Sequence, residues 1–539
     1  MATLTTRNDS IRHRAALVAV CLALTAVVSA VSSLMVALPD LARATGATQT
    51  ELSWIVDGYA LTFAALLLPG GYLGDRLGRR RVLLAGLTLF VAATLAAGVT
   101  DRPAALIGVR VAMGVAAALV MPATLSTITA TFPEAERIRG VAVWTGLAGA
   151  SAVLGLLGSG LLLTWWSWRS IFLLSSTIGG IALIASWRNV PESQEPQTGR
   201  FDGVGAALAV VGLGVGVYSI IEAPTYGWSA GRTVVGLIAG AVVLAGFVLW
   251  ELRTPAPLLD VRLFRHGGFT GGTLAVSALF FLFFGFVFVF VQYLQFVRDW
   301  SPLVTACAVL PLAAGLMPGA RVAPHLVARF GVRPVCAAGM TLVAGAMCGL
   351  ATVGASTTYW LVAALLWVLG TGMGWAMTPA TSAITDALPR DQQGVASAMN
   401  DLARECGGAL GIAVLGSILS STYRSQVQVQ RLPATAAERA RESVAAATHF
   451  GGPVARSARD GFVAGMHHAL FTGAGVVALC GLLVVVLLRS REGDGTPPRQ
   501  LRLAGGQTTR AGRPGSRPGG AEAPRAVRQA RPSPFLLDP

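Results

Sequence analysis

Ionisable side chains are rare inside the long apolar stretches of this 539-residue chain, and they are the groups that could perform chemistry there. Asp57 lies in the segment 54–59 (Trp-Ile-Val-Asp-Gly-Tyr), and Arg110 lies in the apolar segment 106–114. A charge inside a membrane is costly, so such a group faces a cavity or a partner and marks a path for ions or substrate. Asp57 is therefore a candidate proton-binding group.

Asp57 and Arg110 are predicted at the same depth. At 1.5 Å per residue, Asp57 lies about 9 Å below the outer end of its helix, and Arg110 lies at a similar level of another helix. Their opposite charges predict an ion pair. The alternatives are a carboxylate hydrated at the headgroup level for Asp57, and snorkelling of the side chain to the interface for Arg110.

A second charged cluster, Asp401, Arg404 and Glu405, enters a later apolar segment. It is a candidate for proton coupling, or Asp401 and Arg404 form an ordinary i,i+3 pair on a helix surface. The chain shows no nucleophile–base, metal-ligand or phosphate-loop pattern, so we expect no enzyme activity, no metal and no cofactor other than a proton gradient.

A short basic loop between two apolar segments is the most informative motif. Three glycines permit a sharp turn, and one acid is followed by four arginines. Such a loop is typical of the cytoplasmic side of a membrane. The residues are Gly71, Gly74, Asp75, Arg76, Gly78, Arg79, Arg80 and Arg81.

Composition predicts an all-α integral membrane protein. Hydrophobic residues make up 54% of the chain, charged residues 12%, and mean hydropathy is +0.63. A spanning helix needs about 20 mostly apolar residues, and fourteen such windows are present. They are 14–38, 52–71, 81–99, 104–128, 140–162, 170–187, 203–222, 232–251, 269–294, 302–325, 334–353, 359–383, 394–420 and 465–488.

The arginines predict an orientation with both termini in the cytoplasm. The N-terminal tail and the inner loops then carry seventeen arginines and the short outer loops five, as the positive-inside rule requires. The net charge of +15 could indicate nucleic-acid binding, but the charges lie in loops and tails between spans, so we expect a lipid bilayer and no nucleic acid as partner.

The chain also repeats itself. Residues 76–80 (Arg-Leu-Gly-Arg-Arg) recur at 329–333 (Arg-Phe-Gly-Val-Arg), an offset of 253, and the Gly-Val-Ala at 140 recurs at 394. Two parallel six-helix bundles with two inserted spans follow from this. The predicted regions are a cytoplasmic N-tail (1–13), an N-terminal bundle (14–187), the inserted spans with their loops (188–268), a C-terminal bundle (269–488) and a disordered basic cytoplasmic tail (489–539).

The ninth window is unusually aromatic, with seven phenylalanines between positions 280 and 290 and Tyr293 after them. These rings could form a hydrophobic binding surface. Because they point to nearly every side of a helix, contact with lipid is the favoured interpretation.

Together these features resemble the fourteen-spanner drug:proton antiporter branch of the major facilitator superfamily over residues 14–490. The resemblance rests on the basic loop, Arg110 with Gly114, Trp168-Arg169 followed by Phe172, and the segment 407–411 (Gly-Gly-Ala-Leu-Gly). It implies export of hydrophobic or cationic small molecules by proton antiport with alternating access, from a monomer in the inner (plasma) membrane. It also implies that the basic loop, with Asp75, acts as a conformational latch.

The chain departs from that family's pattern at positions linked to coupling. Ala30 stands where an acid is common, Met35 where an Asn is common, and Leu156 and Ser159 replace a proline and a glycine of the fifth span. Two alternatives therefore stay open: a metabolite facilitator or importer without proton antiport, and a membrane sensor or scaffold that transports nothing.

Overall fold

The structure is a computed structural model that describes residues 2–193, 201–255, 257–388, 393–430 and 432–488. All regular elements in these ranges are helices. The tail predicted at 489–539 lies outside the described residues. The helices are α1 (Ala2–Thr45), α2 (Gln49–Leu77), α3 (Arg79–Val99), α4 (Pro103–Thr131), α5 (Glu134–Trp165), α6 (Arg169–Asn189), α7 (Gly203–Tyr226), α8 (Gly231–Glu251), η1 (Val261–Arg265), α9 (Gly267–Phe296), α10 (Pro302–Ala308), α11 (Leu310–Phe330), α12 (Val332–Leu350), α13 (Tyr359–Asp386), α14 (Gln393–Gln426), α15 (Ala434–Glu442), α16 (Val444–His449) and α17 (Gly452–Leu487).

Fourteen segments of the described chain are helical, long and apolar enough to cross a membrane, with α10 and α11 together forming one of them. Each of the fourteen predicted windows overlaps one of these segments. The number of spans and the all-helical class are therefore confirmed. In a bilayer a helix satisfies its own backbone hydrogen bonds, so apolar runs of this length adopt no other open structure.

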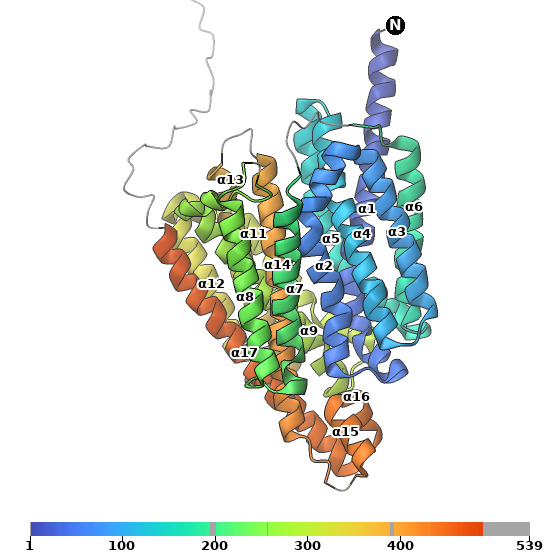
Figure 1. Ribbon diagram of the computed structural model, residues 1–539, viewed down its shortest axis with the longest axis vertical. Coiled ribbons are helices and arrows are strands. Elements are labelled where there is room, and N and C mark those ends of the chain that lie inside the picture. The colour runs from blue at the N-terminus through green and yellow to red at the C-terminus, as the bar shows by residue number, and fades with distance from the viewer. Residues whose placement is uncertain (1, 194–200, 256, 389–392, 431, 489–539) are drawn as a thin grey trace, which may run out of the picture. The chain divides into compact units, whose positions relative to one another are not determined.

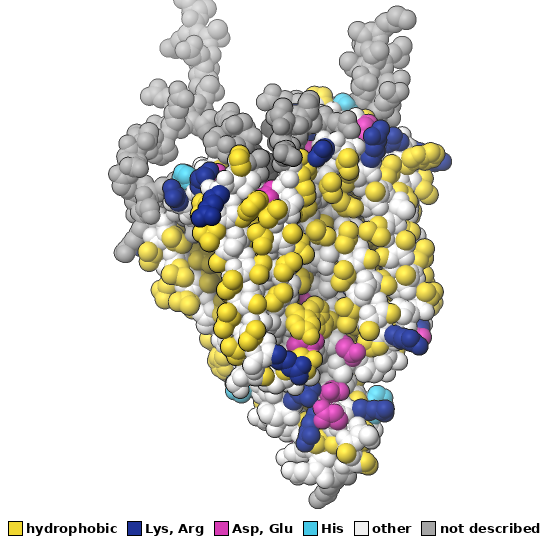
Figure 2. Space-filling view, in the orientation of Figure 1, with side chains coloured by type: hydrophobic (Ala, Val, Ile, Leu, Met, Phe, Trp, Pro, Cys, Tyr) yellow, Lys and Arg dark blue, Asp and Glu magenta, His cyan; other side chains and the backbone are white. Residues whose placement is uncertain are grey.

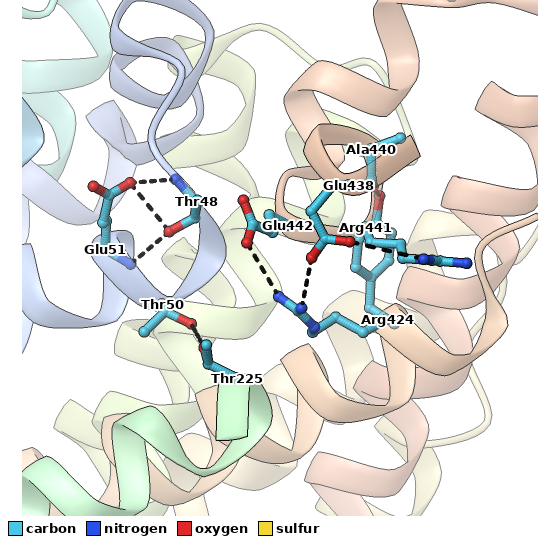
Figure 3. Close-up of polar contacts among 10 residues, drawn as sticks. Thr48, Thr50, Glu51, Thr225, Arg424, Glu438, Ala440, Arg441 and Glu442 are labelled. Carbon is cyan, nitrogen blue, oxygen red and sulfur yellow. Dashed lines mark hydrogen bonds and ion pairs between the residues drawn. The ribbon is translucent and has the colours of Figure 1, made fainter. Parts of the chain in front are cut away.

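Local sequence signals set the helix ends. Thr48 and Glu51 form a capping box at the start of α2: the Thr48 N–H donates to Glu51 Oε2 (2.8 Å), and the Glu51 N–H donates to Thr48 Oγ1 (3.1 Å; Figure 3). Gly78 separates α2 from α3 with φ = 105°, and Gly331 separates α11 from α12 with φ = 87°. Only glycine adopts these values readily, so the repeated loop makes the same junction twice.

The helices group into two bundles and an inserted pair. Helices α1–α6 pack among themselves, and α9–α14 pack with one another and with α17, while α7 and α8 form a hairpin (Figure 1). α7 lies against α2 and α14, which also contact each other. The two bundles therefore meet along α2 and α14, where α7 covers the contact, and they also meet where α5 contacts α10 and α1 contacts α9.

Helix packing repeats in both bundles. Gly114 of α4 approaches the Tyr59 carbonyl of α2 so closely that a Cβ on Gly114 would lie 2.6 Å from that oxygen. In the second bundle Gly370 of α13 approaches the Leu312 carbonyl of α11 in the same way. The two pairs are offset by 256 and 253 residues, close to the 253 and 254 of the sequence repeat, so the same kind of helix contact occurs in both bundles.

One expectation needs correction. Contact with lipid is wrong for Phe286, Phe288 and Phe290 of α9, which are at most 1% exposed because α9 is surrounded by α13, α14 and α17. α1 begins at Ala2, so the predicted N-terminal tail (1–13) is helical from that residue on, while the first candidate span begins at His13. Between α14 and α17 the chain forms two further short helices, α15 and α16. Arg424 of α14 pairs there with Glu438 and Glu442 of α15 (Figure 3).

Candidate functional site

Arg110 is fully buried between α4 and α2. Its Nε donates a hydrogen bond to the Ile55 carbonyl (2.9 Å), and its guanidinium carbon lies 4.4 Å from the centroid of the Tyr59 ring. One terminal nitrogen, Nη2, has no hydrogen-bond partner among the described residues. The arginine is thus held by a backbone carbonyl and an aromatic face, without an acid, and it does not snorkel to the interface.

Asp57 is also fully buried, and neither of its carboxylate oxygens has a hydrogen-bond partner among the described residues. The ion pair with Arg110 that equal depth predicts is therefore not formed. The reason is helical phase: a step of two residues turns an α-helix by about 200°. Ile55 and Tyr59 face Arg110, so Asp57 points to the other side of α2.

That other side is the contact between the two bundles. Ser53, one turn before Asp57, lies against Gly416 of α14, where an added Cβ would be 3.0 Å from the Ser53 Oγ. Leu61, one turn after Asp57, packs in a cluster with Ala413 of α14. Asp57 is consequently an unpaired carboxyl group in the apolar surface where the bundles meet.

The inserted pair closes this surface from outside. Trp54 of α2 packs in the same cluster with Val217 and Ile221 of α7, and its indole Nε1 donates to Glu222 (3.0 Å). Trp54 and Glu222 were not predicted from the sequence. A tryptophan three residues before Asp57 was visible, but its partner lies 168 residues away, beyond the reach of local patterns.

The second charged cluster lies on α14, whereas Asp57 lies on α2. Arg404 Nη1 is 3.5 Å from Asp401 Oδ1, and the Arg404 guanidinium carbon lies 4.6 Å from the centroid of the Phe280 ring on α9. Glu405 is half-buried. The structure leaves Asp401 and Arg404 as an i,i+3 pair.

An apolar cavity of about 90 Å³ lies between the two bundles. α1 and α5 contribute from the first bundle, and α9, α11 and Val309 at the junction of α10 and α11 contribute from the second. Ser32 is the only hydroxyl-bearing side chain among its lining residues, so the cavity suits an apolar group. The lining residues are Ser32, Met35, Ala152, Val153, Leu156, Phe283, Phe284, Val287, Val309, Leu310, Leu312 and Ala313.

Part of the ninth-span aromatic set lines the cavity between the bundles. Phe283 and Phe284 belong to this cavity, together with Leu156, the residue that replaces the expected proline. The sequence showed the aromatic residues but not which two of them face the space between the bundles.

The bundles are also joined at the end near α16, where the outer loops were predicted. Gln295 of α9 donates from Nε2 to the Val36 carbonyl of α1 (2.8 Å), and Arg43 of α1 donates to the Gln295 carbonyl (3.4 Å). Arg43 also pairs with Asp40 (2.8 Å). These bonds hold the two bundles together on this side of the cavity.

The basic loop is ordered by contacts within the first bundle. Arg79 pairs with Asp75 (Nη2 to Oδ1, 2.8 Å) and is 5% exposed, while Arg76 is exposed. The Arg80 guanidinium donates to the Trp187 carbonyl (2.6 Å), and the Arg80 N–H donates to Glu192 (3.2 Å). The loop therefore ties α2 and α3 to the end of α6.

The three glycines of the loop have different surroundings. Gly78 needs its positive φ, and a Cβ there would lie 2.6 Å from Glu192 Oε1. A Cβ on Gly71 would lie 3.6 Å from Pro122 Cβ, an ordinary contact distance. Nothing lies within 4 Å of the position that a Cβ on Gly74 would occupy. Only Gly78 is required by the geometry of the described residues.

Two bundles of repeated packing, fourteen spans and an apolar cavity between the bundles define a multi-pass membrane transporter fold. Residues 19–412 match the Major Facilitator Superfamily. The chain belongs to this family.

Relatives of this chain include resistance and export proteins. The multidrug resistance protein Stp of Mycobacterium tuberculosis is 34% identical over 72% of both chains. The tetracenomycin C resistance and export protein of Streptomyces glaucescens is 31% identical over 86% of this chain and 90% of its own. The methyl viologen resistance protein SmvA of Salmonella typhimurium is 36% identical over 74% of this chain and 81% of its own.

Solved structures share the fold. The inward-facing, unoccupied structure of a bacterial homologue of the human lysosomal transporter Spinster has a TM-score of 0.63 at 14% identity, covering 90% of this chain and 99% of its own. The POT family transporter PepTSo has a TM-score of 0.61 at 14% identity, covering 88% of this chain and 99% of its own. At this identity the likeness concerns the fold alone.

Proposed function

We propose that this protein exports hydrophobic or cationic small molecules by proton antiport, through alternating access of its two bundles. The observation that carries the proposal is Asp57, an unpaired carboxyl group in the contact between α2 and α14. The apolar cavity beside Phe283 and Phe284 and the resistance proteins among the relatives support the substrate class.

Coupling follows from the cost of burying an unpaired charge. An ionised carboxylate in a dry contact needs a cation, a proton or water to be stable. When α2 and α14 separate, water or a cationic substrate can reach Asp57; when they close again, a proton can take that place. Proton uptake on one side and release on the other would then alternate with substrate movement.

Arg110 has a positioning role in this scheme. Its bond to the Ile55 carbonyl and its contact with the Tyr59 ring hold the residues two positions before and two positions after Asp57. The α2 face that carries Asp57 is thereby kept toward α14. Glu405, which is half-buried on α14, is the second candidate proton-binding group.

The proposed setting is the cytoplasmic (inner) membrane, with both termini in the cytoplasm and the chain acting as a monomer. The arginine count of the loops supports this orientation. A facilitator or importer without antiport is the second candidate, supported by Leu156, which lines the cavity where the expected proline is missing. A sensor or scaffold that transports nothing would leave the cavity without a use.

The test is efflux of a fluorescent hydrophobic cation from cells that carry the Asp57→Asn variant. The variant should reach the membrane and should lose the part of efflux that a protonophore abolishes in the wild type. Asp101→Asn is the matched control, because Asp101 is an exposed acid paired with Arg169 at a loop, and it should behave as wild type.

Three results would contradict the proposal in different ways. Efflux against a gradient with unchanged protonophore sensitivity in Asp57→Asn would move the coupling group elsewhere, first to Glu405. Wild-type efflux that ignores the protonophore would favour the facilitator, and no substrate movement in reconstituted vesicles would favour the sensor.

A further inference from the structure

The inserted hairpin of α7 and α8 has no role in the mechanism above beyond covering α2 and α14. α8 packs mainly against α7, and its other side is open: Val235, Val242 and Leu249 are 65%, 63% and 55% exposed. Figure 2 shows this face as largely hydrophobic between ends that carry charged side chains. In a membrane protein such a surface is in contact with lipid.

A groove of about 400 Å³ opens on this surface where α8 ends, a size typical of small-molecule sites. Two leucines and a glycine line the apolar part of the groove, and an arginine and a tryptophan line its end. The lining residues are Leu208, Gly246, Leu249, Trp250, Arg253, Thr254 and Pro255. Gly246 leaves the groove open, because nothing lies within 4 Å of the position that its Cβ would occupy.

The Trp250 side chain, which forms one wall of the groove, is fixed by hydrogen bonds. Its indole Nε1 donates to both carboxylate oxygens of Asp202, at 2.9 and 3.0 Å. Asp202 is 9% exposed and also caps α7 by accepting a hydrogen bond from the Gly205 N–H (2.8 Å). The ring therefore has a fixed position, and its remaining surface is 40% exposed.

Arg253 is the charged group at the mouth of the groove. It is exposed, and no carboxylate in the described part of the chain pairs with it. Asp202 already accepts the hydrogen bond of Trp250, and the Thr254 hydroxyl donates to the Trp250 carbonyl (3.0 Å). Arg253 is consequently free to bind an anion from outside the protein.

We propose that this groove binds one anionic phospholipid, with its headgroup phosphate on Arg253 and an acyl chain along Gly246, Leu249 and Leu208. A phospholipid combines a phosphate with an apolar chain, and the groove places a cation and an apolar surface in that order. Tryptophan at the end of a spanning helix belongs at the headgroup level, and basic pockets between spanning helices suit anionic headgroups. This inference depends on the chain spanning the membrane and not on proton antiport.

The experiment measures lipid binding to the purified full-length protein by native mass spectrometry, with phosphatidylglycerol and with phosphatidylcholine. We expect wild type to retain phosphatidylglycerol preferentially and Arg253→Ala to bind it about fivefold more weakly. Gly246→Leu should lose both lipids at this site, since its side chain would fill the groove without changing any charge.

Two matched controls separate the groove from general effects. Arg232→Ala removes an arginine at the other end of the hairpin, which contacts Tyr226, and Gly180→Leu adds the same side chain to α6 where space is open. Both should bind lipid as wild type does. Thermal melting of each variant checks that it is folded.

Three outcomes would overturn the proposal. Unchanged phosphatidylglycerol binding in Gly246→Leu would mean that the groove is not the site. Equal losses in Arg232→Ala and Arg253→Ala would indicate general surface attraction. Displacement of the lipid by inorganic phosphate alone would mean that the site binds a free anion and has no specific use for the acyl chain.

Discussion

The contact of Gly114 with α2 offers a sharp test of the packing that positions Asp57 and Arg110. In Gly114→Ala the new Cβ would lie 2.6 Å from the Tyr59 carbonyl oxygen, 2.9 Å from Thr62 Cβ and 3.2 Å from the Phe63 nitrogen. Ordinary non-bonded contacts lie about 3.5–4.0 Å apart, so α2 and α4 must separate by about 1 Å. Two of the three atoms are backbone atoms, and no rotamer change can move them aside.

The cost can be estimated from two contributions. Overpacking of a tight contact destabilises a protein by about 1–3 kcal/mol. Arg110 lies one turn from Gly114, so the same separation stretches its 2.9 Å bond to the Ile55 carbonyl. Loss of a hydrogen bond to a charged group would add about 1.5–3 kcal/mol.

The assay is thermal melting of the detergent-purified variant, followed by size-exclusion chromatography of the fraction that stays folded. Gly108→Ala is the control on the same helix, because nothing lies within 4 Å of its Cβ position. There the better helix propensity of alanine, about 1 kcal/mol, should leave stability equal or slightly higher. If Gly114→Ala melts at the same temperature as Gly108→Ala, the close approach of α2 and α4 is wrong.

Three further predictions concern other parts of the chain. Gly370→Ala should destabilise the second bundle as Gly114→Ala does the first, because Gly370 meets the Leu312 carbonyl, and melting of the double variant should show independent costs; a harmless Gly370→Ala would contradict the structural repeat. Asp75→Asn breaks the 2.8 Å pair with Arg79 and should slow transport turnover while substrate binding stays measurable in purified protein; equal loss of both would place Asp75 in the binding site. Truncation after Glu492 should leave membrane insertion and efflux intact, since the removed segment has few apolar residues to bury; loss of the protein from the membrane fraction would show otherwise.

Several features of the fold were predictable from the sequence because the bilayer leaves few choices. Apolar runs of about 20 residues must form helices there, so hydropathy alone located all fourteen spans. The repeat was visible because the two bundles use glycines for the same purpose, as Gly78 and Gly331 show at the two single-residue junctions.

The site depended on information that local patterns do not hold. Depth along a helix can be counted, but the direction of a side chain depends on helical phase and on which helix lies opposite. Asp57 and Arg110 match in depth and still point apart, because Ile55 and Tyr59 take the α4 side of α2.

The same limit applies to the aromatic span. The sequence determined that α9 is rich in phenylalanine, and only the packing of α13, α14 and α17 around it decided that Phe286 and Phe290 are core residues while Phe283 and Phe284 line the cavity. Hydrophobicity places a residue out of water, and it does not distinguish lipid from protein as the apolar neighbour. That choice is made by contacts between segments far apart in the chain, which is why tertiary structure alone could settle it.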